Sequence, residues 1–229
     1  MRQYALAAAF GFGVIGAAAA TPLSFTATVG GIATGPDLNV LTFDVPGLPA
    51  GVTLVLHDAQ IVTGSVTNLY AMPYFSNNNG TFFGETPANG QDATPYVAVE
   101  GGGTATFEFA SPQTYFGLLW GSVDTYNSLS FYDGNGELIG TIDGADVAAS
   151  ANGNQGLNGT DYVNVFSSEA FTTVVANSSN NAFEFDDVAY DPPPSGIPEP
   201  SSLALAGAAL IGLGVMRRRG VSLLRKLKV

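Results

Sequence analysis

Apolar and polar positions alternate along the middle of the chain. Within residues 23–29, Leu, Phe, Ala and Val alternate with Ser and Thr, and residues 104–109 repeat the pattern. A period of two is typical of β-strands, in which successive side chains point to opposite faces. Apolar runs and alternation predict further strands at Val40–Val45, Gly51–His57, Ile61–Thr67, Tyr96–Val99, Thr114–Trp120, Ser128–Tyr132, Glu137–Ile142, Tyr162–Phe166, Phe171–Ala176 and a last strand from Phe183 to Tyr190.

Turn residues separate these predicted strands. Asp133-Gly134-Asn135-Gly136 lies between two of them and is a hairpin signal. Asn- and Gly-rich stretches at Ser76–Gly80, Ala151–Thr160 and Asn177–Asn181 indicate exposed loops. No long helical pattern and no internal repeat interrupts residues 21–190. We therefore predict one all-β domain over these residues, a two-sheet jelly-roll-like β-sandwich.

The charges are segregated along the chain. All seven basic residues lie at the two ends, and Thr21–Ile197 carries eighteen of the nineteen acidic residues with no Lys or Arg. Such a surface repels phosphates, which excludes nucleic acid as a partner. Each carboxylate of the body must therefore be solvated, hydrogen-bonded or bound to a cation. The chain has no cysteine, which excludes disulfides and thiol chemistry.

The first twenty residues have the organisation of a signal peptide. Arg2 is followed by the apolar run Tyr4–Ile15, and Ala18 and Ala20 fit the cleavage pattern that makes Thr21 the first mature residue. We expect the Sec export machinery and signal peptidase to act on residues 1–20. The alternative is an N-terminal membrane anchor, for which a Gly- and Ala-rich run is poorly suited.

The C-terminal end predicts a second membrane segment. A Pro-rich linker at residues 191–197 precedes Pro198-Glu199-Pro200 and an apolar run at 201–216. As a helix this run spans about 24 Å at about 1.5 Å per residue, against a bilayer core of about 30 Å. It is therefore a short transmembrane helix, the alternative being a buried amphipathic one. The positive-inside rule places the residues that follow it in the cytoplasm, namely Arg217, Arg218, Arg219 and the basic tail 220–229.

The Pro-Glu-Pro motif, the apolar span and the arginine cluster together resemble the PEP-CTERM sorting signal at residues 198–219. The resemblance implies recognition by an exosortase at the membrane. It also implies release to, or attachment at, the cell surface or extracellular polysaccharide. The extension GVSLLRKLKV departs from the usual pattern, because such tails end soon after the basic cluster. The segment Tyr115–Val147, with WGSVDTYN and FYDGN, resembles a group of exosortase-dependent surface proteins whose activity is not established.

Two carboxylates in the last predicted strand are candidate metal ligands. Phe183 and Phe185 are at odd positions, whereas Val188 and Tyr190 are at even positions. All four can face the same side only if an extra residue, a β-bulge, is inserted near Asp186-Asp187. A bulge can re-aim a carboxylate, and calcium is the candidate cofactor because it takes hard oxygen ligands. The alternative is a pair of solvated carboxylates before the linker.

Two weaker candidates for a binding site are the hairpin at residues 133–137 and a group of aromatic residues that begins at Trp120. Asp133, Asn135 and Glu137 have the spacing of a calcium loop, but a plain hairpin turn explains them as well. A sugar-binding platform would use the aromatic residues Trp120, Tyr126 and Tyr132, although a lone Trp in a sandwich is usually core.

The catalytic signals are sparse. His57 is the only histidine, and no G-x-S-x-G motif surrounds any serine, so we expect His57 to be structural. Paired carboxylates can hydrolyse glycosides, but this body has no Lys or Arg to position a substrate. We therefore expect a non-enzymatic exported surface or matrix protein with a structural or adhesive role. A carbohydrate-binding module is the first alternative and a carboxylate-dependent hydrolase the second.

Overall fold

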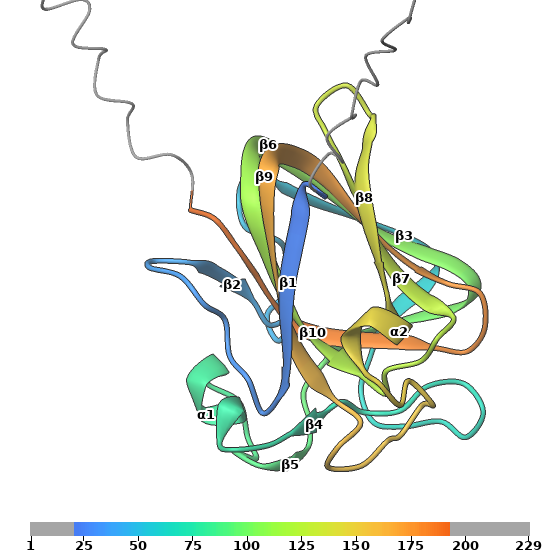
Figure 1. Ribbon diagram of the computed structural model, residues 1–229. Coiled ribbons are helices and arrows are strands. Elements are labelled where there is room, and N and C mark those ends of the chain that lie inside the picture. The colour runs from blue at the N-terminus through green and yellow to red at the C-terminus, as the bar shows by residue number, and fades with distance from the viewer. Residues whose placement is uncertain (1–20, 193–229) are drawn as a thin grey trace, which may run out of the picture. The chain divides into compact units, whose positions relative to one another are not determined.

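A computed structural model describes residues 21–192, in which most residues of regular structure are in strands (Figure 1). By its internal contacts, the chain divides after Tyr190. The elements in chain order are β1 (Leu23–Val29), β2 (Asn39–Leu41), β3 (Val52–Val62), β4 (Tyr74–Phe75), α1 (Asn79–Phe83), β5 (Gly90–Gln91), β6 (Tyr96–Gly121), β7 (Asn127–Tyr132), β8 (Leu138–Asp143), α2 (Gly144–Val147), β9 (Asp161–Ser178) and β10 (Phe183–Tyr190).

β6 and β9 are long, paired strands that organise the rest. The first part of β6 lies against the end of β9, with Thr104 opposite Asn177. The last part of β6 lies against the start of β9, with Trp120 opposite Asp161. The register shifts in the middle, and Figure 1 shows the two ribbons curving together. Each strand therefore contributes two differently oriented halves to the fold.

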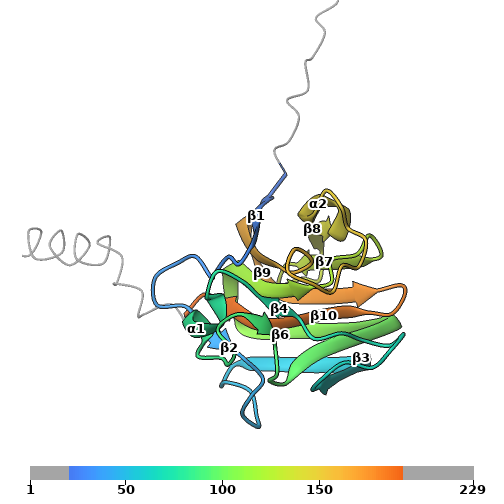
Figure 2. The ribbon, with the colours of Figure 1, turned by 90° about the horizontal axis from the view of Figure 1, so that it is seen from below.

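The remaining strands attach to these two halves. β3 pairs with the first part of β6, β1 pairs with the start of β9, and the hydrogen-bonded order elsewhere is β2-β10-β6-β9-β7-β8. β10 touches both ends of β6, because Phe185 lies opposite Val97 as well as Trp120. β4 and β5 form a separate two-stranded sheet. The mostly antiparallel arrangement is compatible with the predicted two-sheet β-sandwich (Figure 2).

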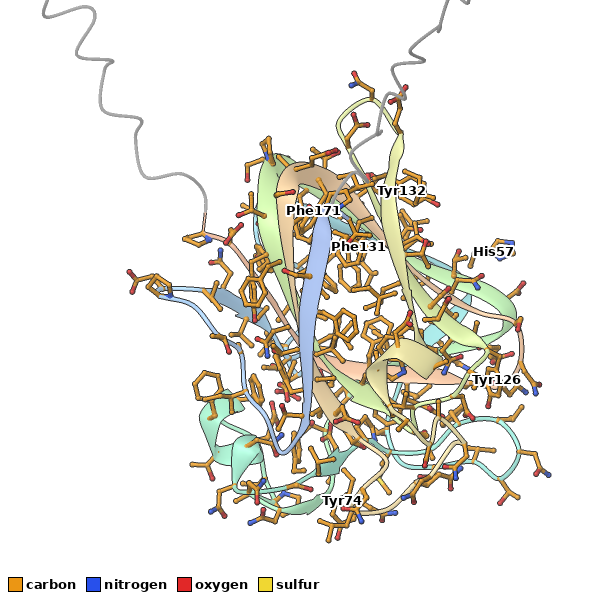
Figure 3. The ribbon with its side chains drawn as sticks, viewed as in Figure 1. His57, Tyr74, Tyr126, Phe131, Tyr132 and Phe171 are labelled. Atoms are coloured by element: carbon orange, nitrogen blue, oxygen red, sulfur yellow. The ribbon has the colours of Figure 1, made fainter. Side chains whose placement is uncertain are left out.

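Aromatic side chains fill the space enclosed by β6, β7, β9 and β10. Phe131 and Phe171, both labelled in Figure 3, are fully buried and meet edge to face with ring centroids 5.2 Å apart. Phe107 contacts Phe116 and Phe185 in the same cluster, at 5.6 and 5.9 Å. Aromatic rings bury large apolar areas and prefer such tilted contacts. The Phe-rich composition is therefore used in the core.

β6 continues through two places where the sequence predicts a break. Tyr96–Val99, residues 104–109 and Thr114–Trp120 were expected as separate strands but belong to one. Gly102 has a φ of +85°, and a Cβ on Gly103 would lie 2.3 Å from the backbone oxygen of Asp58. The glycines therefore let the strand bend while it stays paired. β9 likewise joins the two strands expected at 162–166 and 171–176.

Two predicted strands are shorter than expected. β2 covers only the start of Val40–Val45. The strand expected at Ile61–Thr67 is wrong beyond Val62, because residues 66–70 form a turn closed by hydrogen bonds between Val66 and Tyr70. Local apolar composition does not distinguish such a turn from a strand.

The predictions for both chain ends fall outside the described residues. They comprise the signal peptide at 1–20, the sorting motif at 198–200 and the transmembrane helix at 201–216. Within residues 21–192, no helix has the length and apolar character needed to cross a membrane.

Candidate functional site

A polar hollow lies between four segments of the chain, and we call it the Asp124 cleft. Its volume is about 640 Å³, and its lining residues come from the segments 65–70, 122–126, 152–155 and 180–184. Most of them carry amide, hydroxyl or carboxyl groups, for example Asn68, Gln155 and Asn181. Such groups suit a polar ligand with many hydroxyls better than an apolar one.

Hydrogen bonds connect two walls of this cleft. The Tyr126 hydroxyl donates to the backbone oxygen of Asn181 at 2.8 Å, and Asn127 Nδ2 donates to the Ala182 oxygen at 3.0 Å. Asn127 Oδ1 accepts from the Ser178 hydroxyl at 2.6 Å. The segment after β6 is thereby attached to the turn between β9 and β10. The resemblance motif WGSVDTYN therefore includes residues that build the structure.

Two carboxyl groups line the cleft in different ways. Glu184 is 2% exposed and accepts hydrogen bonds from the Ala71 N–H at 2.8 Å and the Ser122 hydroxyl at 2.7 Å. Burial raises the pKa of Glu184 to about 7. Desolvation also raises the pKa of Asp124, which lies beside Tyr126. Because both oxygens of Glu184 are engaged within the protein, its carboxyl group serves the structure of the cleft wall.

The predicted aromatic platform is not assembled. Trp120 has no exposed surface and stacks on Phe183 at a centroid distance of 4.3 Å, so it cannot offer a face to a sugar. Tyr126 lines the cleft, whereas Tyr132 is at the end of β7 and is not among the lining residues (Figure 3). Of the three residues, only Tyr126 is placed to contact a ligand in the Asp124 cleft.

A second group of polar side chains is buried near β10, and we call it the acidic cluster. Its members are four carboxyl side chains: Glu85, Asp92, Asp186 and Asp187. The three Asp side chains have no exposed surface, and Glu85 is 6% exposed. The exposed Asp44 lies beside Glu85 and interacts with it. The members come from the segments that follow α1 and β5 and from β10, so distant parts of the chain meet here.

Burial and mutual repulsion perturb the whole acidic cluster. Desolvation, followed by the charges of Glu85 and Asp92, raises the pKa of Asp187 to about 9. Desolvation and the interaction with Asp44 raise the pKa of Glu85 to about 8. Desolvation raises the pKa of Asp92 and, with the added charge of Asp187, raises that of Asp186 well above its usual range. Low dielectric and like charges both disfavour the ionised form.

The predicted β-bulge at Asp186-Asp187 is present. Asp187 has a φ of +50°, and the register moves from Asp186 opposite Leu119 to Ala189 opposite Gly117. β10 thus advances by three residues while β6 advances by two, so β10 contains one extra residue here. Both carboxylates are fully buried, so the alternative of two solvated groups is wrong.

The other sequence candidates are structurally ordinary. Asp133 Oδ1 accepts from the backbone N–H groups of Asn135 and Glu137 at 2.9 and 2.8 Å, and these bonds lower the pKa of Asp133. This pattern is that of a hairpin turn. His57 is exposed on β3, with Nδ1 3.3 Å from Asp58 (Figure 3).

Sequence reasoning missed Glu85, Asp92 and Asp124. The first two lie in irregular segments that carry no periodic signal, and their approach to β10 depends on tertiary packing. Asp92 is followed by Thr94, whose N–H donates to Asp92 Oδ1 at 2.9 Å. The Asp-x-Thr spacing indicates a local turn, but it does not identify what the other carboxyl oxygen faces.

Comparison with known proteins adds information about the tail. Similarity to the tailspike protein 4 enzymatically active domain of bacteriophage CBA120 is weak, at 11% identity and a TM-score of 0.19. It covers 74% of this chain and 19% of that one. No curated protein matches the chain. Residues 196–219 match the PEP-CTERM protein-sorting motif. The motif implies an exported, membrane-associated protein that an exosortase processes and that then reaches the cell surface.

Proposed function

We propose that this protein is a structural or adhesive component of the cell surface or extracellular matrix. The match of residues 196–219 to the PEP-CTERM motif carries the proposal. The body supports it, because Thr21–Ile197 is acidic and lacks Lys and Arg. Such a surface stays soluble by self-repulsion outside the cell. We interpret the body as a jelly-roll-like sandwich without catalytic activity.

The tail acts as a transient anchor in this proposal. Residues 201–216 cross the membrane, Arg217–Arg219 stay in the cytoplasm, and Pro198-Glu199-Pro200 lies outside, where the exosortase acts. Signal peptidase removes residues 1–20 beforehand. The sorted body is released or joined to extracellular polysaccharide.

Mass spectrometry of the mature protein from its native host tests the sorting step. We expect a C-terminus near Pro198–Pro200. Replacing these three residues together with Ala should leave the chain uncut and in the membrane fraction. The matched control replaces Pro192, Pro193 and Pro194 with Ala, which keeps the number of changes but spares the motif. A wild-type protein that ends at Val229 would contradict exosortase processing.

Carbohydrate binding is the second candidate function, favoured by the Asp124 cleft. Amide and hydroxyl groups from four segments line it, and Tyr126 adds an aromatic ring. Sugar hydroxyls pair with such groups, and apolar sugar faces stack on aromatic rings.

A glycan array with the purified chain tests this second candidate. Tyr126→Ala should reduce binding at least about tenfold, a loss of about 1.4 kcal/mol. Tyr132→Ala, outside the cleft, should bind as the wild type does, and near-ultraviolet circular dichroism verifies folding. Equal binding by both variants would remove the Asp124 cleft as the glycan site.

A further inference from the structure

The acidic cluster places four carboxyl groups at buried positions. Three of its members have no exposed surface, and Asp44 adds a fifth carboxyl group on the solvent side. Residues 21–192 contain no Lys or Arg, and the single His57 is exposed and beside Asp58. No positively charged side chain of the described body can therefore compensate this group.

The oxygens of the acidic cluster are also short of hydrogen-bond donors. Neither Oδ1 nor Oδ2 of Asp187 has a hydrogen-bond partner among the described residues, and the same holds for Oδ2 of Asp92 and Oδ2 of Asp186. The Asp92 and Asp186 side chains nevertheless lie in contact with each other. Two ionised carboxylates have no donor to share. The group therefore needs bound protons or a bound cation.

The backbone holds these carboxylates in defined positions. The Asp92 N–H donates to the Pro73 oxygen at 2.9 Å, and Asp92 Oδ1 accepts from the Thr94 N–H. Asp186 Oδ1 accepts from the Asp187 N–H at 2.7 Å. The backbone oxygen of Asp187 accepts from the Tyr162 hydroxyl at 3.0 Å. One oxygen of Asp92 and one of Asp186 are thus fixed, while the other oxygen of each is left for a ligand.

We propose that Asp92, Asp186 and Asp187, with Glu85, bind a calcium ion in the exported protein. Among the described residues, no three His, Cys, Asp or Glu side chains are already arranged as a metal site. The carboxylates must therefore draw together around the ion. A divalent charge offsets the mutual repulsion of the carboxylates.

Calcium fits this site better than other common cations. All the available ligands are hard oxygens, which excludes a preference for zinc or copper. Calcium takes six to eight oxygens in irregular geometry and accepts bidentate carboxylates, whereas magnesium demands a near-ideal octahedron. The ion would connect the bulge of β10 to the segments that follow α1 and β5. This proposal concerns the body and does not depend on sorting.

Calorimetric titration of the full chain in detergent tests the proposal. After treatment with EDTA and its removal, calcium chloride should bind with one site per chain. The unfolding temperature should rise by about 5–10 °C when free calcium is 100 times its Kd. Magnesium at the same concentration should give a smaller rise.

Variants locate the ion. Asp187→Asn and Asp92→Asn should each weaken calcium binding at least about tenfold, because fewer charged ligands remain. In EDTA the same variants should unfold at a higher temperature than the wild type, because the Asn amide can donate a hydrogen bond to a neighbouring carboxyl oxygen that lacks a partner. Glu184→Gln is the matched control, since it removes a buried carboxyl group from β10 whose oxygens already have donors. It should leave the calcium affinity within about twofold.

Three results would overturn the proposal. The first is no binding heat and no stabilisation at calcium concentrations up to about 10 mM, beyond the weakest extracellular sites. The second is wild-type affinity in both Asn variants, which would place the ion elsewhere. The third is equal stabilisation by magnesium, which would remove the assignment to calcium.

Discussion

Asn127 holds the segment after β6 against the turn that precedes β10, and its removal should measurably destabilise the fold. Its side chain has no exposed surface, donates to the Ala182 oxygen at 3.0 Å and accepts from Ser178 at 2.6 Å. Asn127→Ala deletes both bonds and leaves the buried Ala182 carbonyl without its side-chain donor. The Ser178 hydroxyl can still donate to the Asn180 oxygen.

The expected cost follows from these losses. Each hydrogen bond contributes about 0.5–1.5 kcal/mol, and an unpaired buried acceptor costs about 1–3 kcal/mol. Asn127→Ala should therefore lower the free energy of unfolding by about 3 kcal/mol. For a chain of this size, the unfolding temperature should fall by about 6–12 °C.

Urea unfolding, followed by circular dichroism in EDTA, measures this cost. Asn135→Ala is the control, because Asn135 is exposed in the β7–β8 hairpin and its loss should change stability by no more than about 0.5 kcal/mol. The double variant Asn127→Ala/Ser178→Ala should be less destabilised than the sum of the single variants, because the two residues share a bond. If Asn127→Ala were no worse than Asn135→Ala, the assignment of a structural role to this motif would be refuted.

Three further predictions concern Glu184, Trp120 and Gly144. The folded-state pKa of Glu184, about 7 against an ordinary 4.5, means that its contribution to stability is complete below pH 4.5 and is lost as the pH rises to about 7. The free energy of unfolding of the wild type minus that of Glu184→Gln, measured with urea in EDTA, should fall by about 3 kcal/mol between pH 4.5 and pH 8. A difference that does not change with pH would contradict the burial of Glu184. Trp120, the single tryptophan, should emit at short wavelength and resist quenching by acrylamide until the protein unfolds, whereas strong native-state quenching would show an exposed ring. A Cβ at Gly144 would lie 1.9 Å from the Asp124 backbone oxygen, so Gly144→Ala should lower the unfolding temperature, and an unchanged temperature would argue against this contact.

The fold class was accessible from the sequence, but the extent of the strands was not. Alternation identified many strand segments correctly because strands such as β1 and β7 bury one face more deeply than the other. It could not show that β6 runs from Tyr96 to Gly121, since Gly101-Gly102-Gly103 and Ser111-Pro112 are ordinary signs of a turn. Whether a glycine ends a strand or bends it depends on the neighbouring strand.

The candidate sites show the same division. The change of parity between Phe185 and Val188 predicted the bulge, because it is a local property of one strand. The approach of Glu85 and Asp92 to that bulge depends on contacts with distant segments, which no spacing in the sequence encodes. The predicted sugar-binding role of Trp120 was wrong for a related reason. Alternation places Trp120 in a strand, but only the packing of the fold shows that its ring stacks on Phe183.

The pairing of the first strand with the ninth has a consequence for transport. The Ser168 N–H donates to the Pro22 oxygen at 2.9 Å, across 146 positions of the chain. When the chain crosses the membrane from its N-terminus, β1 emerges first, whereas its pairing partner β9 emerges almost last. Contacts so far apart in sequence form slowly. The sheet therefore cannot close around β1 until β9 has been exported as well.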